Sequence, residues 1–194
     1  MTKIAFVTTN NNKVETLQKK LCNSNIELIW SNIKLLEPQS DSFTTVAIAK
    51  AEQAFNLLGI PVLVHDSGLT IPELNNFPGV YTKYISDTIG NNGILKLLQD
   101  AKDRSAYLEQ TLCYYDSKII KCFSDKVPGH ISKELTSCPS NNKKWGKIWD
   151  IFIPLGFEQP RSQIPDNKYF EKRPEIQIGN AWDDLLSFLT FIKD

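Results

Sequence analysis

The sequence predicts a mixed α/β fold: an elongated mixed central sheet with flanking helices and two lobes around a cleft. Residues 4–66 alternate apolar strand-like runs with amphipathic stretches, which is typical of parallel strands joined by helices. Residues 106–124 instead have a hairpin pattern, and antiparallel strands there argue against a doubly wound parallel sheet. The 194 residues suffice for one two-lobed domain, 1–194.

The first predicted strand covers residues 4–7, an apolar run of the kind that is buried inside a sheet. A polar loop, residues 8–13, follows it directly. Val14, Leu17 and Leu21 then recur at helical spacing with polar residues between them, which predicts an amphipathic helix. This order places free backbone N–H groups at the start of the helix, where phosphate groups bind favourably.

The polar loop carries hydroxyl, amide and ammonium groups that suit phosphate binding. It is not a Walker A loop, because it has no glycine and no Gly-Lys-Ser/Thr sequence. An Asn-rich helix cap beside a solvated lysine explains the same pattern equally well, so both interpretations stay open. The candidate phosphate-binding residues are Thr8, Thr9, Asn10, Asn11, Asn12 and Lys13.

A second strand is predicted at residues 26–30, followed by a polar loop that carries the carboxylate of Glu37. An apolar stripe then predicts a helix over residues 43–58, which Gly59 ends. Lys50 lies on the polar side of this helix. Taken alone, it fits an ordinary solvated charge.

A third strand is predicted at residues 62–64 and is expected to end at Asp66, where Ser67 and Gly68 continue the chain into a turn. Open α/β sheets bind ligands at the carboxyl ends of their strands. Asp66 is therefore a candidate functional residue. An ordinary Asp-Ser-Gly turn is the competing interpretation. A second turn is expected at Pro78-Gly79.

The second half of the chain is predicted to be hairpin-rich and less regular. His130 is expected to be an ordinary surface residue. The expected elements are a helix at 93–98, strands at 106–115 and 118–124 joined at Asp116-Ser117, a turn re-entering a strand at 127–131, a polar loop at 139–144, a long irregular connection at 155–180 and a helix at 182–192.

Composition narrows the class of partner. Lys plus Arg and Asp plus Glu both number 22, so no basic field attracts a nucleic-acid polymer. No apolar run reaches the roughly 18 residues of a membrane span, and we expect a soluble, cytoplasmic protein with no membrane partner. The cysteines have neither zinc-site spacing nor the pattern of a disulfide framework, so we expect reduced, mostly structural thiols. They are Cys22, Cys113, Cys122 and Cys138.

Three segments, in this order, resemble the inosine triphosphate pyrophosphatase family. Residues 8–13, Thr-Thr-Asn-Asn-Asn-Lys, are similar to the family's Thr-Gly-Asn-x-x-Lys. Glu37-Pro38 precedes Lys50 at nearly the family spacing, with one residue inserted. Residues 65–69, His-Asp-Ser-Gly-Leu, are followed by Pro-Gly-Val-Tyr at 78–81, which resembles the central family signature.

The resemblance implies Mg²⁺-dependent hydrolysis of a nucleoside triphosphate to monophosphate and pyrophosphate, on deaminated purines such as ITP, dITP and XTP, by a homodimer. It implies that Glu37 and Asp66 bind the metal and that Asp66 also orients or activates the water. The phosphates would be held by Lys13, Lys50 and Lys83, with Ser67 and the loop from Thr8 to Asn12. Trp149 and Asp150 correspond to family positions that lie over the base.

The C-terminal third departs from the family. Lys147 stands where a base-stacking phenylalanine is usual, and the late Ser-His-Arg that reads the base is absent. Arg173 and Lys168 are candidate substitutes. His65 replaces a glutamate beside Asp66, which removes a negative charge next to the expected metal.

Two alternatives to an active pyrophosphatase follow from these departures. One is a catalytically degenerate family member that acts as a nucleotide- or protein-binding module. The other is a phosphatase or nucleotide hydrolase that acts on a different, modified substrate.

Overall fold

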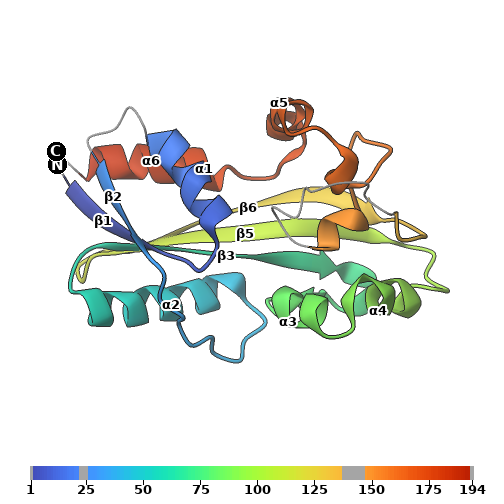
Figure 1. The fold of residues 1–194 in the computed structure, drawn as a ribbon, viewed down its shortest axis with the longest axis horizontal. Helices are drawn as coiled ribbons and strands as arrows, with labels where there is room; N and C mark the ends of the chain where they lie inside the picture. Colours follow the sequence, from blue (N-terminus) through green and yellow to red (C-terminus); the bar gives the residue numbers. More distant parts are fainter. Residues whose placement is uncertain (1, 22–25, 137–146, 193–194) are drawn as a thin grey trace. The chain divides into compact units, whose positions relative to one another are not determined.

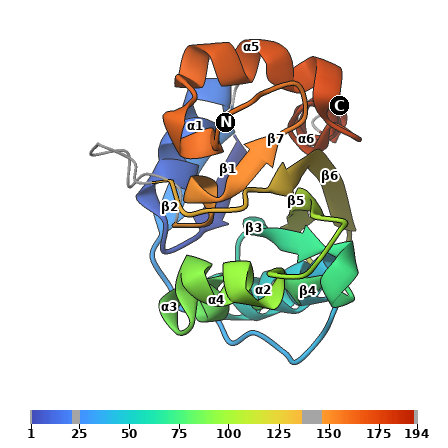
Figure 2. The ribbon, with the colours of Figure 1, turned by 90° about the vertical axis from the view of Figure 1, so that its right-hand side faces the viewer.

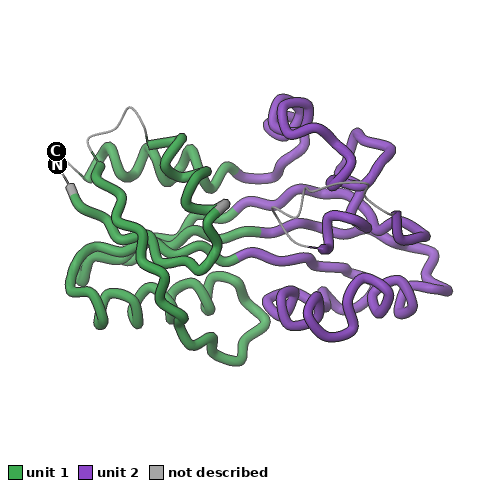
Figure 3. Tube along the Cα trace, viewed as in Figure 1, with its two compact units in different colours: residues 1–66, 110–124, 180–194 green, residues 67–109, 125–179 purple. Residues whose placement is uncertain are grey.

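The computed structural model describes residues 2–21, 26–136 and 147–192. By its internal contacts the chain divides into two compact units, which Figure 3 shows in different colours. Unit 1 comprises residues 1–66, 110–124 and 180–194, and unit 2 comprises residues 67–109 and 125–179.

The strands form a seven-stranded sheet of order β2-β1-β3-β5-β6-β7, in which β4 pairs with β3. Parallel and antiparallel pairs both occur, so the prediction of a mixed sheet is confirmed. With η for short 3₁₀ helices, the elements are β1 (Thr2–Val7), α1 (Asn11–Leu21), β2 (Ile26–Ser31), α2 (Phe43–Leu58), β3 (Val62–Ile71), η1 (Pro72–Leu74), β4 (Phe77–Gly79), α3 (Thr82–Asp87), α4 (Gly90–Leu97), β5 (Ser105–Tyr115), β6 (Ile120–Ile131), η2 (Lys147–Asp150), β7 (Phe152–Pro154), η3 (Arg161–Gln163), α5 (Asp166–Ile176) and α6 (Ala181–Phe191).

Unit 1 has helices on both faces of its strands (Figure 1). β1 runs parallel to β2 on one side and to β3 on the other. Because side chains alternate along a strand, Ile4 and Phe6 of β1 pack with α1 and α6, whereas Ala5 and Val7 pack with α2. Burial on both faces explains why these strands are apolar runs without alternation.

Helix α2 has the bounds that the sequence predicts, and both of its ends are capped. The hydroxyl of Ser42 accepts a hydrogen bond from the backbone N–H of Thr45. Gly59 takes the left-handed conformation, with φ of 66°, and donates its N–H to the carbonyl of Phe55. The alanines of its apolar stripe are fully buried against the sheet, which holds the helix in place.

Unit 2 is built around antiparallel pairs. β4 pairs with β3, and β7 pairs with β6. Its core joins Leu69 and Ile71 of β3 to Ile94 of α4 and Phe152 of β7. Figure 2 shows the short helices α3 and α4 side by side in this unit.

The strands are longer than the sequence predicts. β3 does not end at Asp66 but continues to Ile71, because Leu69 and Ile71 supply further buried apolar side chains and pair with β4. β6 likewise runs through residues 127–131, where a turn was expected. Pro128 and Gly129 lie within this strand without ending it.

Three helical segments also differ from the predictions. α1 already begins at Asn11, so the polar loop is shorter than expected. Pro78 and Gly79, where a turn was expected, lie in β4, and α3 follows this strand and was not predicted. The connection at 155–180 contains α5, although Pro174 lies inside that helix. The terminal helix is confirmed as α6, whereas the predicted loop at 139–144 lies outside the described residues.

Across residues 2–21, 26–136 and 147–192, no helix has both the length and the apolar character needed to cross a membrane.

Candidate active site

Two carboxylates and a lysine from three separate segments of unit 1 meet at one point. The Nζ of Lys50 donates hydrogen bonds to Glu37 Oε1 at 2.9 Å and to Asp66 Oδ1 at 3.1 Å. The side chains of Lys50 and Asp66 are 14% and 13% exposed, whereas that of Glu37 is 56% exposed. The cluster is therefore buried on the side of the sheet and open on the side of the loop.

The fold explains why these residues meet. Asp66 lies two residues after Val64 and four after Val62, so all three side chains point to the α2 face of β3. Lys50 lies on α2 four residues before Ala54, at the edge of the buried stripe. Lys50 is thus mostly buried and paired, and its interpretation as an ordinary solvated helix charge is wrong.

Burial and charge attraction oppose each other in this cluster. Burial raises the pKa of Asp66 above its ordinary value, and the ammonium groups of Lys50 and Lys13 offset only part of that rise. For Lys50, burial acts to lower the pKa, but attraction to Asp66 and Glu37 outweighs it, so the pKa of Lys50 is raised. The ammonium is held charged, and an added cation would favour ionised Asp66.

Gln53 holds the loop that carries Glu37, a contact that sequence reasoning missed. Its Oε1 accepts the backbone N–H of Leu36 at 2.8 Å, and its Nε2 donates to the carbonyl of the same residue at 3.2 Å. Gln53 lies three residues after Lys50 on α2, on the same side of the helix. This helical spacing was the available signal.

The loop after β1 and the start of α1 lie beside β3. The Nζ of Lys13 donates to the backbone carbonyl of His65 at 3.2 Å. The loop is fixed by Thr8, whose hydroxyl accepts the N–H of Asn10 and whose carbonyl accepts the indole N–H of Trp30. Of the other candidate phosphate-binding residues, Thr9 and Asn11 are exposed, and the side chain of Asn12 is outside the described part.

His65 and Asp66 point to opposite faces of β3. The imidazole of His65 is buried on the face covered by α1 and α6, with its ring edge-to-face with Trp182 at 5.5 Å between centroids. Asp66 instead bonds Lys50 on the α2 face. A change at position 65 therefore acts on the core under α6 rather than directly on the carboxylate cluster.

The other candidate residues belong to unit 2. Ser67 and Lys83 are exposed, on β3 and α3 respectively. Trp149 and Asp150 are half-buried at the end of η2. Unit 1 therefore brings together four of the candidate residues: Glu37, Lys50, Asp66 and Lys13.

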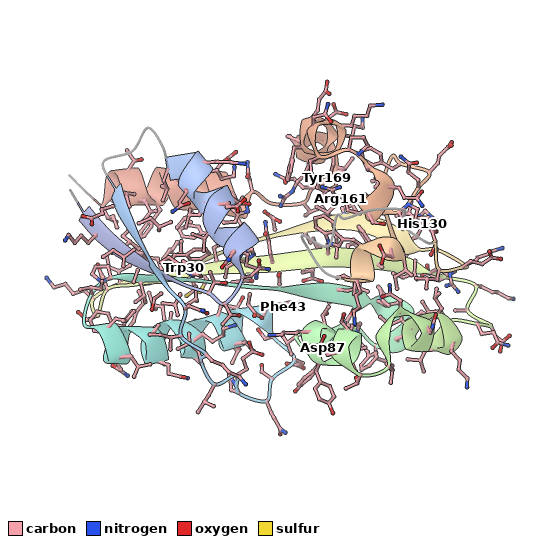
Figure 4. All side chains as sticks on the ribbon, viewed as in Figure 1. Trp30, Phe43, Asp87, His130, Arg161 and Tyr169 are labelled. Atoms are coloured by element: carbon pink, nitrogen blue, oxygen red, sulfur yellow. The ribbon has the colours of Figure 1, made fainter. Side chains whose placement is uncertain are left out.

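A buried arginine packs against aromatic residues of unit 2, a contact that no pattern in the sequence indicated. The guanidinium carbon of Arg161 lies 3.9 Å from the ring centre of Tyr169 and 4.4 Å from that of Trp149. Figure 4 labels Arg161 and Tyr169, which lie together above β6. Arg161 also donates to the carboxylate of Asp166 at 2.6 Å, which balances its charge.

The two candidate substitutes for the base-reading arginine differ in surroundings. The guanidinium of Arg173 donates to both oxygens of Asp125, at 3.1 and 3.3 Å. The side chain of Asp125 is 1% exposed, so this pair is a structural ion pair of unit 2. Lys168 is exposed on α5. His130 is exposed on β6, as expected.

The cluster in unit 1 fits a magnesium ion. One ammonium nitrogen already contacts an oxygen of Glu37 and an oxygen of Asp66, so both carboxylates can reach a single cation. Mg²⁺ is typically bound by one or two carboxylates, water and substrate phosphates. Within the described ranges no group of three or more His, Cys, Asp or Glu side chains is placed to hold a metal ion.

Comparison with known proteins gives consistent matches. The Ham1 family model matches residues 4–168. A dITP/XTP pyrophosphatase of Saccharolobus solfataricus is 44% identical over 154 residues, covering 79% of this chain and 78% of that protein. A dITP/XTP pyrophosphatase of Thermococcus kodakarensis is 36% identical over 192 residues, covering 99% and 98%.

Solved structures match along nearly the whole chain. A HAM1 protein from Coxiella burnetii has a TM-score of 0.82 at 23% identity and covers 98% of this chain and 99% of its own. The Ham1 protein of Staphylococcus aureus has a TM-score of 0.77 at 23% identity, covering 97% and 98%. At these identities the likeness shows the shared fold.

Proposed function

Because the chain belongs to the Ham1 family, we propose that it hydrolyses non-canonical purine nucleoside triphosphates, such as dITP and XTP, to the monophosphate and pyrophosphate. The observation that carries this proposal is the bridge from Lys50 to Glu37 and Asp66. Cleavage of the bond between the α- and β-phosphates requires cations near the phosphates and a carboxylate beside the attacking water. Unit 1 brings both kinds of group together.

Each residue of the cluster has a proposed task. Asp66 orients the attacking water and accepts its proton, because it is the buried carboxylate whose raised pKa favours proton uptake. Glu37 is the more exposed carboxylate and holds the cation with Asp66. Lys13 and Lys50 hold phosphate oxygens, together with the backbone N–H groups at the start of α1.

Glu37 and Asp66 would hold the Mg²⁺. When bound, the ion supplies charge neutralisation for the triphosphate and makes the leaving pyrophosphate a better leaving group. Lys50 now occupies the position between the two carboxylates. We expect it to exchange this contact for one with phosphate when the substrate binds.

The residues proposed to select the base belong to unit 2. Trp149 offers an aromatic surface and Asp150 a carboxylate that accepts hydrogen bonds from base N–H groups. Ser67 and Lys83, both exposed, are proposed to contact phosphate. Lys147 is exposed and stands in place of a stacking aromatic, so stacking falls to Trp149.

A substrate panel tests the proposed reaction. With Mg²⁺, we expect pyrophosphate release from dITP and XTP with kcat/KM at least about 10²-fold above that for dATP and dGTP. Both pyrophosphate and orthophosphate are to be quantified. Release of orthophosphate alone would identify the alternative phosphatase activity.

The degenerate alternative makes a different prediction for the same panel. It expects nucleotide binding, seen as a thermal shift, without turnover of any triphosphate. The carboxylates of Glu37 and Asp66, both bonded to Lys50, favour the active enzyme, because they place a cation site beside a buried carboxylate that can accept a proton. Equal turnover of all standard nucleotides would count against the base preference alone.

The assembly and setting of the protein are also proposals. We propose one two-lobed catalytic domain, a homodimer in solution and a cytoplasmic location, with a single nucleotide as the partner rather than a nucleic-acid polymer or a membrane. Sedimentation velocity at micromolar concentration tests the dimer, for which a single monomeric species would be contrary. Fractionation of cells tests the location.

A further inference from the structure

Two cysteines lie opposite each other on the hairpin of β5 and β6 in unit 1. At the turn, the N–H of Asp116 donates to the carbonyl of Ile119 at 3.3 Å, so these residues are a cross-strand pair. Moving away from the turn in step along both strands, the pairs reach Cys113 opposite Cys122. The register continues unchanged to Thr111 and Ser124, whose hydroxyl oxygens are hydrogen-bonded at 2.8 Å.

The two faces of the hairpin give independent support for this register. Leu112 and Phe123 belong to the core under α1 and α6. Cys113 and Cys122 belong to the opposite core, under α2. Directly paired residues on neighbouring strands have their side chains on the same face, so these faces agree with a register that places Cys113 against Cys122 and exclude a shift by one residue.

The type of pair suits a disulfide. Backbone-bonded and non-bonded pairs alternate along an antiparallel ladder, and Asp116 with Ile119 is a bonded pair. Cys113 with Cys122 is therefore a non-bonded pair, for which the Cα atoms are about 4.5 Å apart. Disulfides join residues whose Cα atoms are roughly 4.4–6.8 Å apart. The backbone does not have to move far for the bond to form.

The two thiols are chemically unequal. Cys113 is fully buried and Cys122 half-buried, and both are free thiols. The interaction between the two thiols lowers the pKa of Cys122 and, together with burial, raises the pKa of Cys113. Cys122 is thus the more accessible sulfur and the one that ionises first, which makes it the nucleophile.

We propose that Cys113 and Cys122 are a reversible disulfide site, formed by reaction with peroxide. The thiolate of Cys122 attacks one oxygen of hydrogen peroxide and becomes a sulfenic acid, while the O–O bond breaks and the other oxygen leaves as hydroxide, which is protonated to water. The thiol of Cys113 then attacks that sulfur. The S–S bond forms, and the sulfenic oxygen leaves with two protons as a second water.

The site is independent of the proposed hydrolysis. Its residues pack beneath α2 on the same face as Phe55, whose ring meets that of Tyr115 edge-on at 5.1 Å. The bond would link the two strands close to the turn, three residue pairs from Asp116 and Ile119. We expect it to stabilise the folded protein by restricting the unfolded chain.

Peptide mapping by mass spectrometry, after the native protein has been oxidised, tests the site. The reduced protein is treated with hydrogen peroxide, the remaining thiols are blocked with N-ethylmaleimide, and the peptides are mapped without reduction. We expect a peptide linking Cys113 to Cys122, which dithiothreitol converts back to two free thiols. A protein in which Cys122 is blocked by maleimide, oxidised beyond sulfenic acid or linked to another cysteine would overturn the proposal.

Variants separate this pair from the other two cysteines. A Cys22→Ala/Cys138→Ala protein should form the linked peptide as the wild type does, whereas Cys113→Ala should not. Oxidation should raise the thermal unfolding midpoint of the wild type by about 5 °C and leave that of Cys113→Ala unchanged. An equal midpoint for the oxidised and reduced wild type would show that the bond does not fit the native strand pair.

Discussion

Asp66 carries the proposed chemistry at the expense of stability. Its carboxylate is buried on the α2 face of β3, and burial raises its pKa even though Lys50 and Lys13 are near. A folded-state pKa above that of the unfolded chain means that the folded protein binds the proton more tightly. Ionised Asp66 therefore destabilises the metal-free protein.

The first prediction concerns the pH dependence of the destabilisation that ionised Asp66 causes. The free energy of unfolding should fall as the pH rises from about 4, the unfolded pKa of Asp, through the higher folded pKa of Asp66. Asp66→Asn removes the ionisation, so at pH 7 without metal this variant should be more stable by on the order of 1 kcal/mol. Urea unfolding of both proteins at pH 4 and pH 7 measures the difference. A variant that is less stable than wild type at pH 7 would be contrary to the account.

The second prediction concerns Gln53, which positions Glu37 through the backbone of Leu36. Gln53→Ala should raise the Mg²⁺ concentration for half-maximal activity by about tenfold, because the metal-binding loop is no longer held. Gln18→Ala on α1, an exposed glutamine of another helix, is the control and should behave as wild type. If Gln53→Ala changes stability but not the Mg²⁺ requirement, Gln53 is only structural.

At the scale of elements, α2 delivers Lys50 and Gln53, so its ends determine how firmly both are held. Ser42 and Gly59 cap the helix, and its end was predictable because Gly59 follows the last apolar residue. Substitution of either capping residue is therefore expected to destabilise α2.

The third prediction uses the left-handed conformation of Gly59. A Cβ there would meet no neighbouring atom within 4 Å, so the effect of substitution is conformational. Gly59→Ala should destabilise the protein by about 1 kcal/mol, and Gly59→Asn by less, because asparagine adopts positive φ more readily. Thermal unfolding compares the three proteins. Equal losses for both variants would mean that packing and not the backbone is responsible.

The elements also show where sequence reasoning failed. The loop of the hairpin was placed at Asp116-Ser117, whereas the paired residues Asp116 and Ile119 flank Ser117 and Lys118. Ser117 adopts a positive φ of 76°, although Gly or Asn usually occupies such a turn position, so the residue type did not indicate the turn. An error of this size changes which residues face each other, so the opposition of Cys113 and Cys122 could not be read from spacing.

At the scale of the whole chain, the fold class and the carboxylate and lysine residues of unit 1 were predictable. Buried parallel strands leave continuous apolar runs, and the spacing from Glu37 to Lys50 to Asp66 carries the family pattern. Arg161 was not predictable, because a buried arginine depends on aromatic partners that the fold supplies. The extension of β3 past Asp66 depends on pairing with β4, which is likewise a tertiary effect.

The fourth prediction tests the central claim that Asp66 and Glu37 form a magnesium-dependent hydrolytic centre. Pyrophosphate release from dITP is measured for wild type, Asp66→Asn and Glu37→Gln over a range of Mg²⁺ concentrations, with circular dichroism to verify folding. We expect no turnover in EDTA, a fall in kcat of about 10²–10⁴-fold for Asp66→Asn, and a raised Mg²⁺ requirement for Glu37→Gln. A folded Asp66→Asn protein that keeps more than about a tenth of the wild-type kcat would contradict the claim.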